Sequence, residues 1–326
     1  MKKIPTIDDV VEARERLKGR AVHTPLIESP ALNALARGRV LIKAECLQRT
    51  GSFKFRGAWN CISRLSAESA KGGVVAYSSG NHAQGVAAAA QIMKLPALIV
   101  MPADTPQIKQ ANTRSYGADV VIYDRATDDR EEIANRLAKE RGAVIVPPFE
   151  HGEIIAGQGT CGLEAIEQAA AFDVRFDAVL IPAGGGGLTA GNALAFSARS
   201  PVTKIHTVEP EDFDDHARSL KSGKRERNGK ATGSICDALL SAMPGELTFS
   251  INQPRLAPGL TVSEAEVKRA MIFAFEVLKL VIEPGGAVGL AAILAGKVAT
   301  EGRSIAVIAS GGNVDPALFA EIICGR

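Results

Sequence analysis

A lysine between two phenylalanines is the residue of this sequence with the clearest chemical use. Lys54 lies between Phe53 and Phe55 in the segment Gln48–Ala58, near an expected helix start. Flanking aromatic side chains can desolvate the amine and lower its pKa, and a neutral amine can form a Schiff base. The spacing alone also fits a surface lysine whose alkyl chain lies along apolar neighbours. Lys54 is therefore a candidate nucleophile, and the spacing alone does not distinguish it from a surface lysine.

Four consecutive glycines follow an apolar strand and open an expected helix; they are Gly184, Gly185, Gly186 and Gly187. Unobstructed N–H groups at a helix N-terminus bind phosphate. Each glycine has an entropic cost that a simple turn would justify only once or twice, which favours a phosphate site. The stretch also fits the dinucleotide fingerprint through Ala190, with Glu209 placed for a ribose, so an NAD-dependent dehydrogenase is an alternative.

Three further loops combine glycine with small polar residues: Ser78–His82, Glu283–Gly286 and Ser310–Asn313. Each of them is expected at the carboxyl end of an apolar strand. Open α/β sheets bind ligands at the carboxyl ends of their strands. We therefore expect these loops to lie together and to outline one site.

The elements that position these residues alternate along the chain, which indicates βαβ units and predicts an α/β fold. The continuously apolar runs indicate strands covered on both faces, at 74–77, 97–101, 120–123, 144–146, 178–181, 205–208 and 305–308. Helices are predicted at 81–93, 106–116, 128–141, 153–171, 187–198, 263–280 and 285–295. Ser263 and Glu266 form a capping box, and Pro106 marks another helix start. Low hydrophobicity and weak periodicity predict a loop-rich excursion at 219–253.

Composition excludes several classes of protein. The 326 residues are 46% hydrophobic and 23% charged, which is typical of a folded protein, and the length suggests two domains. A net charge of +2 argues against a nucleic-acid partner, and no long apolar stretch predicts a membrane span. The five cysteines form no CxxC pair, and no signal peptide is recognisable. A cytoplasmic protein is expected.

Four motifs in register carry a resemblance to a known family. SFKFRGA around Lys54, SSGNHAQG from Ser78, the tetraglycine and SGGN from Ser310 closely resemble the fold-type II pyridoxal-phosphate (PLP) enzymes. The chain is most similar to the serine/threonine dehydratase and serine racemase branch, from about Ile7 to Asp315. The resemblance implies two open, mostly parallel twisted sheets with helices on both faces, as in the tryptophan synthase β-like fold. It also implies a large PLP-binding domain at 1–48 and 148–326, a small domain at 49–147, and a homodimer.

The resemblance also assigns roles to individual residues. Lys54 would hold the cofactor covalently and act on the substrate α-proton, and the four glycines would bind the phosphate. Other cofactor contacts would be Phe53 beside the ring, Asn81 at the 3′-hydroxyl and Ser310 at the pyridine nitrogen. The substrate would meet Ser78, Ser79, Asn81, His82 and Ser241. Ser79 would also be the acid and base on the opposite ring face, where racemases use a serine.

A cation site is implied by the same resemblance. Glu209, the carbonyl of Phe213 and Asp215 match positions that bind Mg²⁺ or Ca²⁺ in racemases, and hard oxygen ligands suit either ion. This assignment replaces the ribose contact of Glu209. An acidic, solvated helix start is the simpler alternative.

The resulting hypothesis is a PLP-dependent ammonia-lyase for a small-molecule amino-acid substrate. L-Threonine or L-serine would lose its β-hydroxyl and yield a 2-oxo acid and ammonia, with Lys54 as the positioned base. A serine racemase and a 3-hydroxyaspartate dehydratase are the nearer alternatives. A dehydrogenase and a catalytically silent ligand-binding protein are the remote ones. Ala238 stands where relatives commonly have glycine, which leaves the substrate open.

Overall fold

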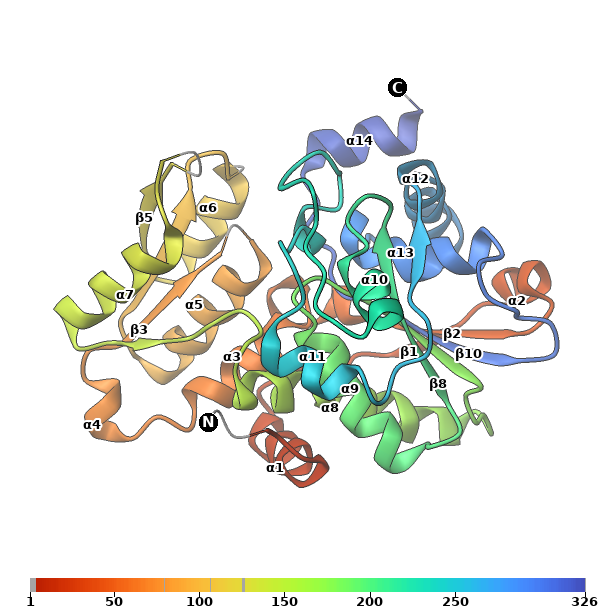
Figure 1. Cartoon of the computed structure of the whole chain (residues 1–326), viewed down its shortest axis with the longest axis horizontal. Coiled ribbons are helices and arrows are strands. Elements are labelled where there is room, and N and C mark those ends of the chain that lie inside the picture. Colours follow the sequence, from red (N-terminus) through yellow and green to blue (C-terminus); the bar gives the residue numbers. More distant parts are fainter. Residues whose placement is uncertain (1–3, 79, 106, 125–126, 326) are drawn as a thin grey trace.

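Two β-sheets form the frame of the protein (Figure 1). The computed structural model describes residues 4–78, 80–105, 107–124 and 127–325. In this part of the chain the larger sheet has the order β1 (Leu26–Glu28), β2 (Arg39–Lys43), β10 (Ser304–Ile308), β7 (Ala178–Pro182), β8 (Lys204–Pro210), β9 (Leu260–Val262). The smaller has the order β5 (Asp119–Tyr123), β4 (Ala97–Pro102), β3 (Val74–Tyr77), β6 (Val144–Ile145). Only β1 and β2 pair antiparallel, so the predicted α/β class with mostly parallel sheets is confirmed.

The helices alternate with these strands along the chain. Their bounds are α1 (Ile7–Leu17), α2 (Pro30–Ala36), α3 (Lys54–Ile62), α4 (Ala67–Ala70), α5 (Asn81–Met93), α6 (Gln107–Ser115), α7 (Arg130–Arg141), α8 (Gly152–Ala171), α9 (Gly187–Arg199), α10 (Asp215–Ser222), α11 (Glu246–Asn252), α12 (Glu264–Phe273), α13 (Pro284–Leu294) and α14 (Pro316–Cys324). The predicted bounds of α5 and the Ser263–Glu266 capping box of α12 are confirmed. Pro106, the predicted start of α6, lies outside the described residues.

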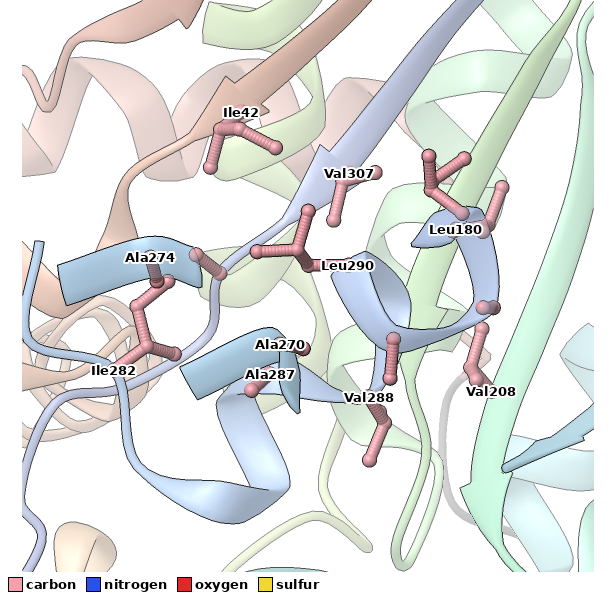
Figure 2. Close-up of a cluster of buried hydrophobic side chains, with 14 of the residues drawn as sticks. Ile42, Leu180, Val208, Ala270, Ala274, Ile282, Ala287, Val288, Leu290 and Val307 are labelled. Atoms are coloured by element: carbon pink, nitrogen blue, oxygen red, sulfur yellow. The ribbon is translucent and has the colours of Figure 1, made fainter. Parts of the chain in front are cut away.

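Both sheets are covered by helices on both faces. In the smaller sheet, Val74 and Ala76 belong to the same apolar cluster as α3 and α5, whereas Val75, which points the other way, packs with α7. In the larger sheet one face packs against α12 and α13. Figure 2 shows Leu180 and Val307 of the strands beside Leu290 of α13. The buried residues of α13 run from Pro284 to Ile293 without a polar face, as expected of a helix inside a core.

The prediction of a loop-rich segment at 219–253 missed one helix that matters for function. Between α10 and α11 the chain is loop-rich, as predicted, apart from a 3₁₀ turn at Asp237–Leu239, but the segment also contains the end of α10 and the whole of α11. In α11 the apolar residues Leu247, Phe249 and Ile251 are all buried. These apolar residues recur every two positions, whereas one face of a helix repeats every three to four. The polar residues Thr248 and Asn252 of the same helix are buried as well. The helix is enclosed on several sides, so its sequence shows no amphipathic period.

Other elements were not predicted or were predicted too long. No pattern in the sequence predicted β1, β2, β9, α1, α2, α4 or α14. The expected helix at 263–280 is α-helical only to Phe273 and continues as a π-helical turn over Ala274–Leu278, after which Lys279 has φ +59°. Five of these elements have seven residues or fewer and carry too few periods for a pattern to be recognised; α1 and α14, with 11 and 9 residues, were missed despite their length.

The described residues contain neither a membrane-spanning helix nor a disulfide bond. No helix there is both long and apolar enough to cross a membrane. Each of the five cysteines is free, and four of them are buried.

Candidate active site

Lys54 begins α3, which lies between the two sheets (Figure 1). Its Nζ donates a hydrogen bond to the carbonyl oxygen of Pro148 at 2.9 Å and lies 5.2 Å from the centre of the Phe53 ring. Desolvation lowers the pKa of Lys54 to about 8, although the negative charge of Glu283 acts in the opposite direction. The neutral amine, which proton abstraction requires, is therefore more accessible near neutral pH than in an ordinary lysine.

The start of α3 is tied to the end of β10. The Phe53 N–H donates to the carbonyl oxygen of Ser310 at 3.1 Å, and Ser52 and Gly311 form an isolated β-bridge. These contacts bring Phe53, Lys54 and Ser310 together, although more than 250 residues separate them. The sequence predicted these three residues in one site from the resemblance alone.

A buried ion network holds α3 on the larger sheet and on α8. Arg56, fully buried, donates to both carboxylate oxygens of Glu45 and of Glu164, at 2.7–2.8 Å. Lys43, also buried, donates to Glu164 at 2.7 Å. Burial opposes the charge on Arg56, but both carboxylates outweigh it and raise the pKa of Arg56 well above its ordinary value. The network contributes two cations and two carboxylates, so its formal charges balance.

The tetraglycine forms the turn between β7 and α9. A Cβ built on Gly185 would lie 2.3 Å from the ring of Phe149, and Gly186 has φ +89°, so part of this run is required by packing and backbone geometry. Packing and backbone geometry therefore account for more of the four glycines than the sequence analysis predicted. Helix α9 begins at Gly187, and its N-cap Gly186 provides no side-chain acceptor for the first N–H groups. These N–H groups remain available to an anion.

Two adjacent residues, Pro148 and Phe149, connect Lys54 with the glycine loop. Pro148 accepts the hydrogen bond from Lys54, and Phe149 packs against Gly185 and Gly187. A base of lowered pKa and an anion-binding helix N-terminus thus face the same space. This juxtaposition is the main chemical feature of the site.

The three polar loops meet, as predicted, but the predicted strand before Glu283 is absent from the described residues, and Ser78 and Ser310 follow strands of different sheets. Asn81 Nδ2 donates to Glu283 Oε1 at 2.6 Å, and Asn313 Nδ2 donates to Asn81 Oδ1 at 2.7 Å. The Glu283 N–H donates to the carbonyl oxygen of Gly311 at 3.0 Å. Burial, followed by the charge of Asp237, raises the pKa of Glu283 to about 7. One residue from each of the three loops thus contributes to a single hydrogen-bonded cluster.

Three of the residues expected to meet the substrate make their contacts at separate points of the site. Ser78 Oγ accepts a hydrogen bond from the Gly80 N–H at 3.2 Å, and Ser241 Oγ lies 3.4 Å from a Cβ built on Gly184. His82 is buried and donates from Nε2 to the carbonyl oxygen of Val146 at 2.8 Å. Burial, with a smaller contribution from Lys54, lowers the pKa of His82 to about 3, so its ring is neutral. Ser79 lies outside the described residues.

Sequence reasoning missed an ion pair at this site. Lys109 of α6 has a side chain that is only 8% exposed, and its Nζ lies 2.6 Å from Asp237 Oδ2. The same Nζ lies 3.6 Å from a Cβ built on Gly80. Lys109 belongs to no recognised motif, and 128 residues separate it from Asp237, so no local pattern marks the pair.

The predicted cation ligands form a buried acidic pair. Glu209 and Asp215 are both 0% exposed, and no ion pair to either is found in the described part of the chain. Glu209 accepts hydrogen bonds from the N–H groups of His216 and Ala217, at 2.8 Å each. Asp215 Oδ1 accepts from Asn228, whereas Oδ2 is buried without a hydrogen-bond partner. Burial raises the pKa of Asp215 to about 7 and, together with Asp215, raises that of Glu209.

This geometry fits a bound cation but not a ribose. The Glu209 carboxylate is enclosed and engaged with backbone N–H groups, so the earlier ribose contact is wrong. Among the described residues, no three His, Cys, Asp or Glu side chains lie close enough to hold a metal ion on their own. A cation here would need the Phe213 carbonyl or water besides the two carboxylates.

The main site also fits a phosphate-bearing ring compound. Its buried polar atoms without hydrogen-bond partners include His82 Nδ1, Glu283 Oε2, Ser52 Oγ and Thr50 Oγ1. Buried polar groups are normally hydrogen-bonded, so such a concentration points to a polar ligand. The glycine loop would hold the phosphate, and Lys54 would hold a carbonyl group.

Comparisons with known proteins agree with this geometry. Residues 18–311 match the family described as pyridoxal-phosphate dependent enzyme. The chain is 44% identical to L-threo-3-hydroxyaspartate ammonia-lyase of Pseudomonas sp, covering 97% of this chain and 98% of that one. It is 42% identical to L-threonine ammonia-lyase of Thermotoga maritima, covering 98% and 78% respectively. The solved structure of maize serine racemase has a TM-score of 0.92 at 35% identity, covering 99% and 98%.

Proposed function

This chain belongs to the pyridoxal-phosphate-dependent enzyme family, and on that premise we propose that it is an ammonia-lyase for β-hydroxy amino acids. The observation that carries this proposal is the desolvated Lys54 beside the glycine loop. The family match contradicts the dehydrogenase alternative. The catalytically silent ligand-binding protein is an outcome of the substrate assay below. PLP, when bound, supplies an aldehyde for the substrate amine and a ring that takes up negative charge from the α-carbon.

The residues of the chain have distinct tasks in the proposed reaction. Lys54 removes the α-proton, for which its lowered pKa is suited. The N–H groups at the start of α9 hold the phosphate, and Phe53, Asn81 and Ser310 orient the ring. Ser78, His82 and Ser241 border the space left for the substrate. Orientation of the α-carbon bonds by these contacts lowers the barrier in addition to the base itself.

Three substrates are candidates. L-Threonine is favoured by the Thermotoga maritima relative, and L-serine differs from it only by a methyl group. L-threo-3-Hydroxyaspartate is favoured by the Pseudomonas relative. Racemisation of serine is a further activity, supported by the maize structure and, in the sequence, by Ser79.

A substrate panel tests this proposal. We expect PLP-loaded protein to release a 2-oxo acid and ammonia from at least one of L-threonine, L-serine and L-threo-3-hydroxyaspartate. The kcat/KM values identify the preferred substrate, and chiral chromatography of serine in the same incubations measures racemisation. The Lys54→Ala protein is the control for non-enzymatic release. Absence of 2-oxo acid from all three substrates would contradict an ammonia-lyase.

We infer that the acidic pair Glu209–Asp215 binds Mg²⁺ or Ca²⁺ with the Phe213 carbonyl. The inference is supported by burial of both carboxylates and by the unpartnered Asp215 Oδ2. Two like charges in one buried space repel each other, and a divalent cation would relieve that repulsion. The ion would stabilise the turn between β8 and α10.

The cation site makes its own prediction. We expect added Mg²⁺ or Ca²⁺ to raise the melting temperature of the wild type, because an ion that binds only the folded state stabilises it by mass action. The Asp215→Asn variant should lose this response. Asp212→Asn is the matched control, because Asp212 lies in the same turn but is exposed and paired with Lys230. Equal responses of all three proteins to the ion would exclude the site.

A further inference from the structure

The carbonyl groups of the glycine loop are held by buried side chains from elsewhere in the chain. His216 Nε2 donates to Gly184 O at 2.8 Å, Thr248 Oγ1 to Gly185 O at 2.7 Å, and Asn252 Nδ2 to Gly186 O at 3.4 Å. All three side chains are 0% exposed. In a trans peptide the C=O of one residue and the N–H of the next point to opposite sides. A hydrogen bond that fixes each of these carbonyls therefore also fixes the direction of the N–H group of the following residue.

His216 lies on a different helix from the other two side chains. Thr248 and Asn252 belong to α11, whereas His216 lies in the first turn of α10. Its own N–H donates to Glu209 Oε1 at 2.8 Å, so the residue is fixed at its backbone as well as at its ring. A carbonyl oxygen can only accept, so Nε2 carries the hydrogen and the imidazole is the donor to Gly184.

The imidazole is also in close packing contact with the loop. A Cβ built on Gly186 would lie 2.7 Å from His216 Cε1. The ring therefore limits both the orientation of the Gly184–Gly185 peptide and the room available at Gly186. No other donor to Gly184 O is found among the described residues, so this peptide depends on His216.

We propose that His216 is a positioning residue for the phosphate-binding loop. Its Nε2–H holds the Gly184 carbonyl away from the cleft and thereby directs the Gly185 N–H toward the cofactor phosphate. The inference rests on the proposed assignment of this loop to the phosphate. Loss of the donor leaves a buried carbonyl unpaired and lets the peptide rotate, so the loop binds the phosphate less well.

The test compares three variants with the wild type in titrations of apoprotein with PLP. His216→Leu removes the donor, and His216→Gln places an amide nitrogen at about the position of Nε2. Ser219→Ala is the matched control, because Ser219 is also 0% exposed on α10 but hydrogen-bonds Asp215 O and Glu226 N instead of the loop. The measurements are the PLP dissociation constant, the ³¹P resonance of bound PLP, and the melting temperature of the apoprotein.

We expect His216→Leu to raise the PLP dissociation constant by about tenfold and to shift the ³¹P resonance. His216→Gln should restore both toward the wild-type values, and Ser219→Ala should lower only the melting temperature. If His216→Leu does not fold, His216→Asn replaces it, because its amide is too short to reach Gly184 O.

Two results would overturn the role of His216. The first is an unchanged dissociation constant and ³¹P resonance in His216→Leu, or in the His216→Asn variant that replaces it. The second is a His216→Gln protein that binds PLP no better than the variant without the donor. If the wild type itself binds no PLP, the proposed function fails. If the wild type binds PLP and one of the two results above is found, only the role of His216 fails.

Discussion

The Lys54→Ala protein is expected to fold, to form no borohydride-reducible linkage with PLP and to lose elimination activity by roughly 10³-fold or more. Folding should survive because the Lys54 amine makes one hydrogen bond, to Pro148 O, and its desolvation opposes its charge. Activity should not survive, because the structure places no other lysine amine against both the Pro148 carbonyl and the Phe53 ring in the described residues.

Mass spectrometry after borohydride reduction locates the linkage directly. The wild type should carry one cofactor mass on the peptide that contains Lys54, and the variant should carry none. Lys71→Ala is the control, because Lys71 is exposed and paired with Glu68 on the surface. A reducible linkage that persists in Lys54→Ala, for example on Lys109, would move the covalent role to that residue.

Arg56→Met is expected to cost roughly 3–5 kcal/mol of the free energy of unfolding, which is typical when one partner of a buried ion pair is removed. The methionine fills most of the space, but Glu45, which is 0% exposed, loses the one cation that pairs with it among the described residues. Glu164 keeps Lys43. The cost therefore arises mainly from one carboxylate left buried without a positive charge.

Urea unfolding of the apoproteins measures this effect. Arg136→Met is the control, because Arg136 and Glu140 form an exposed pair on α7, and such pairs contribute about 0–1 kcal/mol. Adding Glu45→Gln to Arg56→Met should recover part of the loss, because the amide carries no charge. A single variant as stable as the control, or no recovery in the double variant, would show that the network does not fix α3 electrostatically.

The local pattern of the sequence was sufficient for the motifs and for most of the longer elements. The helix Asn81–Met93 and the strand Val74–Tyr77 were predicted with their observed bounds, because period and flanking residues are local properties. The three polar loops were predicted to meet at the carboxyl ends of strands. They do meet, but Ser78 follows a strand of the smaller sheet, Ser310 follows a strand of the larger sheet, and Glu283 follows no strand in the described residues, so the packing of the two sheets brings them together. The roles of single residues, the division into domains and the homodimer remain predictions from the resemblance, and the cytoplasmic location remains a prediction from the cysteine pattern and composition.

The elements that support the site were beyond sequence reasoning. The segment 219–253 was predicted as loop-rich, yet its helix α11 holds two carbonyls of the glycine loop. Enclosure of α11 by its neighbours removed the amphipathic period that would have revealed it. The glycine run itself was attributed mainly to a ligand, whereas Phe149 accounts for part of it.

The sequence by itself determined which side chains can do chemistry: an amine flanked by aromatic rings, a run of unobstructed N–H groups and polar residues at the ends of strands. Only the tertiary structure decided what holds them in place. Arg56 meets Glu164 across 108 residues, Lys109 meets Asp237 across 128, and His216 reaches Gly184 across 32. Each pair joins elements that are neighbours only after the sheets have formed. The spacing of residues along a chain reports local periodicity and carries no record of such distant contacts, which depend on how the completed layers pack.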